Sequence, residues 1–239
     1  MQWFQRRSVY AFGIALMLCL SAGAASAQNK NNTKRMKDAS RHSNDAAKVF
    51  RQIMGAPDRG IPKDLLDRAE AIVVFPGVKK AAFIVGGSGG QGVVSRRARG
   101  GWSEPAFLNL GGGSIGAQIG ASSTDYVLLI MNKEGLNGLL EDKFEMGGEA
   151  SVAAGPVGRT AAATTNATLD AGILSYSRTK GAFAGIALKG AVIGHDNDLN
   201  QAIYGKNAHE LLSGTAMTMN QMPAAVRVFP QTLSLYSKR

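Results

Sequence analysis

Two glycine-rich stretches place serines in patterns that resemble catalytic motifs. Ser88 and Ser114 each stand in a Gly-x-Ser-x-Gly pattern, and both stretches also fit the glycine fingerprint of dinucleotide sites. Either chemistry requires a helix directly after the glycines, because its N-terminus exposes the nucleophile or holds the pyrophosphate. Residues 93–96 and 116–120, which follow the two stretches, favour strands instead. We therefore predict glycine turns here, and leave open whether they border a ligand site.

The other residues capable of acid–base or metal chemistry are few and widely spaced. The three histidines, His42, His195 and His209, form neither an H-x-x-x-H nor an H-E-x-x-H motif. Three acids between positions 141 and 145 have no spacing that nominates a catalytic carboxylate pair. Asp196 or Asp198 is expected to cap the helix that follows. The sequence therefore predicts no enzyme, no metal site and no cofactor.

The strongest chemical signal is a cluster of basic side chains near the beginning of the chain. Residues 28–51 contain seven Lys or Arg and two Asp, which is +5 of the net +10 of the whole chain. Such a local excess predicts attraction to an anionic surface, and the alternative is a solvated arm. Because no aromatic residues alternate with the basic ones, nucleic acid is not a predicted partner. The predicted lipid-binding residues are Lys34, Arg35, Lys37, Arg41, Lys48, Phe50 and Arg51.

Residues 1–27 have the three parts of a secretory signal peptide. Arg6 and Arg7 precede an apolar run over 9–20, and the segment ends in Ala25-Ser26-Ala27. The run is shorter than the ~20 apolar residues that a membrane-spanning helix needs. We therefore predict export to the periplasm or cell envelope, peripheral to the membrane, by either the general or the twin-arginine route.

The remaining chain has the composition of a single globular domain. It contains no cysteine after Cys19, so its stability must come from a packed core rather than from disulfides. Apolar residues make up 45% and charged residues 18% of the sequence, which excludes a disordered chain. The predicted boundaries are 1–27 for the signal peptide, 28–47 for a basic, partly flexible leading segment, and 48–239 for the domain.

Glycine-punctuated β-branched runs alternate with a few amphipathic segments. Strands are predicted over 71–75, 81–85, 93–96, 115–119, 126–131, 150–154, 169–177 and 182–193. Helices are predicted over 40–54, 63–70, 133–142, 196–204 and 207–212. Twenty-three of the thirty glycines lie between positions 86 and 194, and glycine inside strands marks bends and close backbone approaches. We predict one α+β domain, a strongly bent antiparallel sheet or small barrel with short helices at its ends.

The apolar side of the first predicted helix has two possible roles. Val49, Phe50, Ile53 and Met54 recur at helical spacing, with Lys48 and Arg51 on the other side. A basic amphipathic helix can lie in a membrane interface with its apolar side buried in lipid. The same four residues could instead pack on the domain core, and the sequence leaves both roles open.

Several motifs of the body occur in an order that resembles the SYLF domain family. The likeness extends from about Lys48 to Tyr204, and the motifs are Phe75-Pro-Gly, Gly101-Trp-Ser-x-Pro-Ala-Phe, Ser123-Thr-Asp-x-Val-Leu and Leu174-Ser-Tyr-Ser-Arg. That family includes exported bacterial proteins, eukaryotic phosphoinositide-binding proteins and a yeast actin-binding member. In eukaryotic members a basic amphipathic segment leading into the domain contributes to contact with anionic headgroups, and its position here is the stretch ending at Arg51.

The resemblance implies lipid binding with no reaction attached. Two departures weaken parts of it: the turn after Val85 lacks the Arg-Tyr pair of many members, and Asn166 stands where an acid is common. The predicted function is therefore non-enzymatic binding of anionic lipid or of a membrane surface in the envelope. The alternative is a protein-interaction or scaffold module with an envelope partner. Actin is not a predicted partner, because the signal peptide directs the chain away from a cytosol that contains actin.

Overall fold

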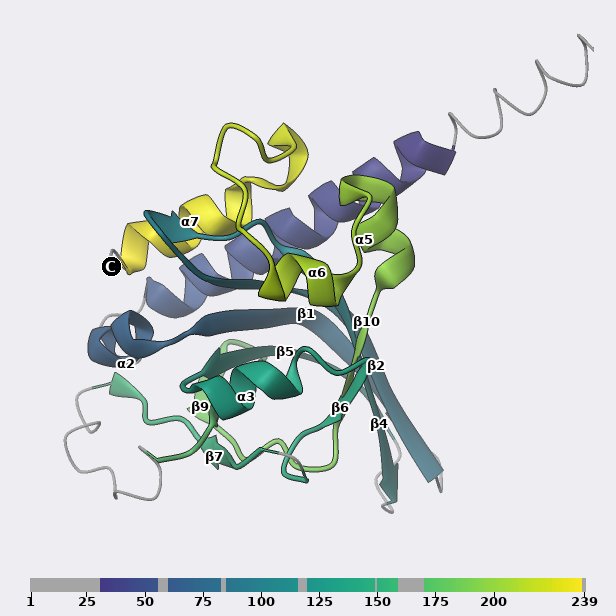
Figure 1. The fold of residues 1–239 in the computed structure, drawn as a ribbon. Helices are drawn as coiled ribbons and strands as arrows, with labels where there is room; N and C mark the ends of the chain where they lie inside the picture. The colour runs from purple at the N-terminus through teal and green to yellow at the C-terminus, as the bar shows by residue number, and fades with distance from the viewer. Residues whose placement is uncertain are drawn as a thin grey trace, which may run out of the picture.

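The computed structural model describes residues 31–55, 60–82, 85–115, 120–148, 150–158 and 170–237. Its centre is a curled sheet of ten strands (Figure 1). The strands are β1 Ala71–Ala82, β2 Val85–Ala98, β3 Gly101–Trp102, β4 Ala106–Ile115, β5 Gly120–Ile130, β6 Lys143–Glu145, β7 Val152–Ala154, β8 Ile173–Thr179, β9 Ala182–Gly185 and β10 Val192–His195. The helices are residues 31–54, α2 Lys63–Arg68, α3 Lys133–Gly138, α5 Asn197–Tyr204, α6 Ala208–Ser213, the 3₁₀ turn η2 Ala224–Val226, and α7 Val228–Tyr236.

The strand order is β6-β10-β4-β2-β1-β5-β8-β7, with β3 paired to β2 and β9 to β8. All of these pairings are antiparallel except β7 with β8, which is parallel. The predicted fold, one α+β domain around a strongly bent sheet, is confirmed, and the sheet is mixed rather than purely antiparallel. Among the described residues, no helix is long and apolar enough to cross a membrane.

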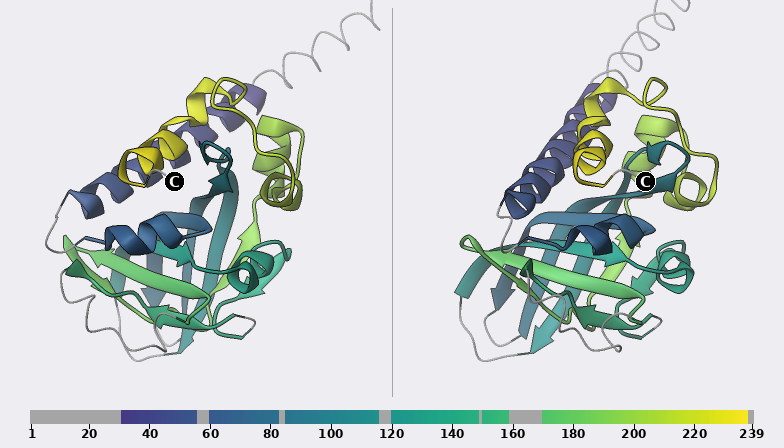
Figure 2. Two further views of the ribbon diagram at one scale, coloured as in Figure 1. Left: turned by 60° about the vertical axis from the view of Figure 1, so that its left-hand side comes forward. Right: turned by 90° about the vertical axis from the view of Figure 1, so that its left-hand side faces the viewer.

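Both faces of the sheet are buried under other elements, and successive residues of a strand point to opposite faces. In β1, Ile72 and Val74 belong to one apolar cluster, whereas Val73 and Phe75 belong to the other. The first cluster also contains residues of the helix 31–54, α2 and α7, and the second contains residues of α6. Figure 2 shows the helix 31–54 and α7 together on one side of the sheet.

The helix 31–54, which we call the leading helix, is part of the domain core. Ala39, Ala46, Ala47, Phe50 and Ile53 are buried in it, and they recur at the three- and four-residue spacing of one helix face. The predicted boundary between residues 47 and 48 therefore falls inside this helix. The predicted signal peptide, residues 1–27, lies outside the described residues and stays a prediction.

Three of the sequence motifs meet at a bend of β1. The register of β1 shifts between Phe75 and Val78, and Gly77 adopts a φ of 57°, which favours glycine. The Gly77 N–H donates to Asp125 Oδ1 at 2.8 Å. Arg178 donates to Asp125 Oδ2 from Nε and Nη2, at 3.0 and 2.7 Å. The bend thus connects β1, β5 and β8 through one carboxylate.

A glycine inside β2 permits a close approach of β1. At Gly92, a Cβ atom would lie only 2.4 Å from a ring carbon of Phe75 and 2.5 Å from the Val74 carbonyl oxygen. Any side chain there would collide with the neighbouring strand, so β1 and β2 approach this closely only because the residue is glycine.

Candidate functional site

One side of the leading helix presents four basic residues to solvent. Lys34, Lys37, Arg41 and Lys48 are all exposed, and at about 100° per residue they fall within about 60° of one another around the helix axis. They extend over about 20 Å of helix, at 1.5 Å per residue. We call these four residues the basic face. The opposite side of the helix is buried in the core, which fixes the direction in which the basic face points.

The other two predicted basic residues interact with neighbouring elements. Arg35 is half-buried, and its Nη2 lies 3.8 Å from Asp198 Oδ2. Arg51 donates from Nη1 to Thr232 Oγ1 on α7 at 2.9 Å. Both guanidinium groups are therefore directed towards neighbouring helices, α5 and α7, and do not belong to the basic face.

Phe50, the remaining predicted lipid contact, is a core residue. Its side chain is 1% exposed, and its ring meets that of Tyr236 edge-on with centroids 5.8 Å apart. Lipid insertion is therefore incompatible with this fold. The apolar side of the helix, including Val49 and Ile53, packs on the sheet and α7 instead, because one continuous core removes it from water.

Two carboxylates stand beside the basic face. Arg41 Nη2 lies 3.1 Å from Asp38 Oδ1, one turn away, and Asp45 is exposed on the next turn. Because the Arg41–Asp38 pair is largely exposed, it contributes little to stability and can open when another anion approaches. The four cations exceed the two carboxylates, so the face keeps a positive field.

An open cleft of about 720 Å³ begins at the basic face and continues over the sheet. Arg41 on the helix and Lys79 on β1 bring two positive charges to its walls. Gln91 and Asn109 add amide groups from β2 and β4, and Asp45 is the one carboxylate among its lining residues. The arrangement fits a compact anionic group held between the helix and the sheet.

His42 also lines this cleft and is 8% exposed, and its buried Nε2 has no hydrogen-bond partner. Burial, together with the charge of Arg41, lowers the pKa of His42 below 6.5, although Asp38, Asp196 and Asp45 oppose the shift. The unfolded chain therefore binds this proton more readily than the folded one, so acid favours unfolding.

We expect the free energy of unfolding to fall as the pH drops below about 6.5, and His42→Gln to flatten this dependence. Urea unfolding of both proteins at pH 7.5 and 5.5 measures the difference. Equal pH dependence in the two proteins would show that His42 does not carry it.

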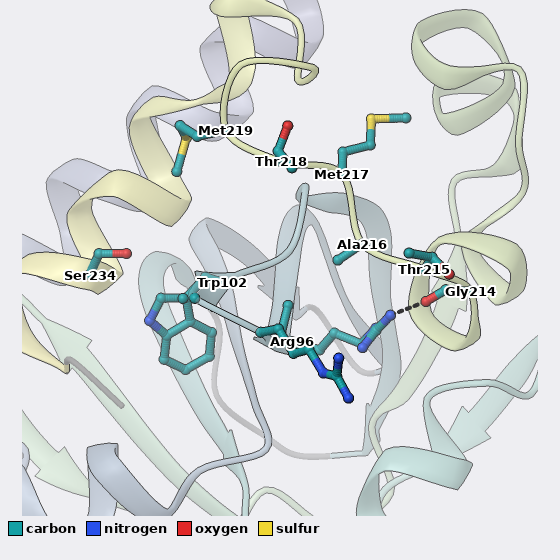
Figure 3. A pocket seen from close by; sticks show the side chains of 13 residues that line it. Arg96, Trp102, Gly214, Thr215, Ala216, Met217, Thr218, Met219 and Ser234 are labelled. Atoms are coloured by element: carbon teal, nitrogen blue, oxygen red, sulfur yellow. Dashed lines mark hydrogen bonds between the residues drawn. The ribbon is translucent and has the colours of Figure 1, made fainter.

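A second hollow, of about 470 Å³, lies between the β2–β3 hairpin, the loop after α6, and α7 (Figure 3). Arg96 donates to the carbonyl oxygens of Gly214 and Arg97, so its guanidinium group holds the loop in place. Trp102, Met217 and Met219 supply apolar surface. No acid or histidine lines the hollow, so its described residues offer no acid–base pair.

The described residues of the two serine motifs lie in strands rather than turns, which corrects the predicted turns. Residues 85–98 form β2 and residues 106–115 form β4, and these two strands pair along the glycines. Because glycine has no side chain, it can adopt the extended conformation of a strand as readily as that of a turn. Ser88 Oγ donates to the Gly112 carbonyl at 3.3 Å, and β2 continues past Gly92 to Ala98, so a strand and not a helix follows this motif. The nucleophile-elbow and dinucleotide geometries are thus absent at Ser88.

The dispersed histidines and acids do not form a metal site in the described part of the chain. No group of three His, Cys, Asp or Glu there has the geometry to hold an ion. His195 Nε2 lies 2.8 Å from the Leu139 carbonyl oxygen, and its Nδ1 lies 3.5 Å from Asp142. Asp196 caps α5 by accepting from the Leu199 N–H at 3.1 Å, as predicted.

The chain is similar to one family of proteins and to several of its members in yeasts and vertebrates. The sequence profile of the family described as "Ysc84: Las17-binding protein actin regulator" matches residues 111–236. An SH3 domain-containing protein of Schizosaccharomyces pombe is 39% identical over 170 residues, covering 69% of this chain and 39% of that protein. LAS seventeen-binding protein 3 of Saccharomyces cerevisiae is 35% identical over 169 residues (68% and 36%). SH3 domain-containing YSC84-like protein 1 of Xenopus laevis is 31% identical over 179 residues (71% and 53%).

These comparisons correct two of the predictions. The predicted location in the periplasm or cell envelope is contradicted, because the matching relatives are proteins of yeasts and vertebrates. The exclusion of actin as a partner is contradicted as well, because the matching family is described as an actin regulator. Both predictions rested on the pattern of residues 1–27. The chain spans only about a third to a half of the relatives' lengths.

Proposed function

Because the chain belongs to the Ysc84 family, whose domain is the SYLF domain, we propose that it is a non-enzymatic binding module that attaches to anionic membrane surfaces through its basic face. The family description and the name of the Saccharomyces cerevisiae relative describe binding proteins and a regulator rather than enzymes. A basic surface is sufficient for attachment to anionic lipid, because this attachment requires no catalytic group.

The observation that carries this proposal is the fixed orientation of the basic face. A solvated arm would scatter its charges, whereas the leading helix holds Lys34, Lys37, Arg41 and Lys48 along one line with its other side buried in the core. Each basic side chain near an anionic surface contributes about 1 kcal/mol. Four together give reversible attachment without a covalent anchor.

The cleft supports the same assignment. A phosphate group that approaches the basic face meets Arg41 on the helix and Lys79 on the sheet. Charged hydrogen bonds of this kind are stronger than neutral ones, so one headgroup held in the cleft would add an oriented contact to the diffuse attraction of the face.

We expect the protein to float with vesicles that contain phosphatidylserine and to remain in solution with phosphatidylcholine vesicles. Binding should weaken steeply as salt rises from 0.1 M to 1 M, because the screening length falls from about 10 Å to about 3 Å. Flotation at several salt concentrations measures this. Equal binding to both kinds of vesicle, or binding insensitive to salt, would contradict the proposal.

A second candidate function is binding to actin filaments, and the family description is the observation that favours it. The names describe whole proteins that are longer than the matched segment, so they do not locate the binding surface. An acidic protein surface would meet the basic face by the same charge complementarity. Co-sedimentation with actin filaments tests this function separately from vesicle flotation.

A further inference from the structure

One hollow lies outside the surface that the proposed function uses. It is the hollow of about 470 Å³ beside the β2–β3 hairpin, which we call the hairpin hollow (Figure 3). Its walls come from the hairpin, from residues 214–219 of the loop after α6, and from Ser234 of α7, and no residue of the basic face lines it. Its volume is within the range of about 300–1,000 Å³ that small-molecule sites have.

Hydrogen bonds hold the hairpin and the loop in place. The Ser103 N–H donates to the Arg96 carbonyl at 2.9 Å, and Ser103 Oγ accepts from the Arg96 N–H at 3.1 Å. In the loop, the Gly214 carbonyl accepts from Arg96, and the Met217 N–H donates to Glu104 Oε2 at 2.8 Å. The walls are therefore positioned before a ligand arrives, which reduces the ordering that binding requires.

The wall of the hairpin hollow carries positive charge. Arg96 and Arg99 are the charged residues that line it in the described part of the chain. Arg96 is half-buried and its guanidinium group donates to two carbonyl oxygens rather than to a carboxylate, while Arg99 is exposed at the turn of the hairpin. The neighbouring Glu104 is 1% exposed and does not line the hollow. The hollow therefore attracts an anion.

The remainder of the wall suits an apolar group. Figure 3 shows Thr218 and Met219 on the loop, across the hollow from Trp102 and Arg96. The Trp102 ring is held by Arg97, whose Cζ lies 3.9 Å from the ring centroid. The Met219 thioether is a favourable neighbour for an aromatic ring. A ligand with an aromatic body beside its anionic group would use both parts of the wall.

We propose that the hairpin hollow binds a small soluble phosphate monoester with an aromatic body, independently of the membrane attachment. Arg96 and Arg99 bind the phosphate, and Trp102 and Met219 contact the body. A guanidinium group forms paired hydrogen bonds with phosphate oxygens. Two cations match a phosphate monoester, with a charge of about −1.5 to −2 at pH 7, better than a singly charged carboxylate.

Four probes separate the parts of this ligand: phenyl phosphate, inorganic phosphate, phenol and benzoate. In spectra of the full chain, phenyl phosphate should shift the resonances of the Met219 methyl group and the Trp102 indole N–H. We expect each of the other three probes to bind on the order of tenfold more weakly, since each lacks one interaction. Absence of both shifts with phenyl phosphate would overturn the proposal, and equal or tighter binding of phenol or benzoate would overturn the phosphate assignment.

Arg99→Ala and Arg68→Ala form a matched pair of variants. Both side chains are exposed, and Arg68, on α2, does not line the hollow. Arg99→Ala should weaken binding of phenyl phosphate on the order of tenfold, whereas Arg68→Ala should bind it like the wild type. Thermal unfolding of both should match the wild type. Equal loss in the two variants would mean that net charge, and not the hollow, attracts the probe.

Vesicle flotation distinguishes this site from the membrane contact. Arg99→Ala should float with phosphatidylserine vesicles like the wild type, and phenyl phosphate should leave flotation unchanged. If Arg99→Ala floated less than Arg68→Ala, the hairpin would contact lipid and the soluble ligand would be rejected. Failure of the wild type to float, with the phenyl phosphate shifts present, would reject the proposed function and support the hairpin hollow as a separate site.

Discussion

Reversal of the basic face by Lys34→Glu, Lys37→Glu, Arg41→Glu and Lys48→Glu is expected to weaken binding to anionic vesicles by two to three orders of magnitude. The four attractions together contribute about 4 kcal/mol, and each tenfold change in affinity corresponds to about 1.4 kcal/mol. The new carboxylates would add repulsion. Titration of phosphatidylserine vesicles at 0.1 M salt measures the loss. The fold should persist, because all four side chains point into solvent.

The matched control reverses Lys133, Lys143, Lys180 and Lys189 to Glu. These four residues are also exposed, and none lies on the leading helix. Both variants change the net charge by the same amount, so a comparison between them separates the position of the charges from their number. Equal loss of binding in the two variants would show that net charge alone, and not the basic face, attracts the protein to the membrane.

Phe50→Ala is expected to lower the free energy of unfolding by about 3–5 kcal/mol, the usual cost of truncating a buried aromatic side chain. Phe50 contacts Tyr236 and belongs to the cluster between the leading helix and the sheet. The cavity would therefore open where the helix is attached to the core. Urea unfolding, followed by the circular dichroism of the helices, measures the change.

Gln52→Ala is the control for this prediction, since Gln52 is exposed two residues farther along the same helix and its loss should leave stability nearly unchanged. The fraction of Phe50→Ala that remains folded should still bind anionic vesicles, because the basic face is intact. Unchanged stability with lost binding would instead place Phe50 at the lipid surface and would contradict the packing in the structure.

Local patterns were sufficient for much of the fold. The β-branched runs of β1 and β5 predict strands without any knowledge of distant contacts. The amphipathic spacing of residues 40–54 likewise predicts a helix by itself. The cap at Asp196 was also visible locally, because a capping side chain bonds to its own next turn. α7 went unrecognised, since it has no charged residue and no side-chain cap, and Pro230 falls within its first turn.

The glycine stretches show where local patterns fail. Gly86 to Gly92 permits a turn and an extended strand equally, and only the pairing of β2 with β1 and β4 selects the strand. The compartment and the partner were inferred from one terminal pattern and were contradicted by the yeast and vertebrate relatives. The pattern of residues 1–27 was therefore not sufficient to predict the compartment or the partner.

The sequence by itself determined the basic cluster, the α+β class and the family, because charge, periodicity and motif order are properties of the chain. Only the tertiary structure decided which side of the leading helix meets solvent. The two roles left open for Phe50 differ in what the helix packs against, and that depends on α7, about 180 residues away in sequence. The same packing sets Arg51, which meets α7, and Arg35, which lies near α5, apart from the basic face. Burial is a property of the assembled core, so no local pattern could have assigned it.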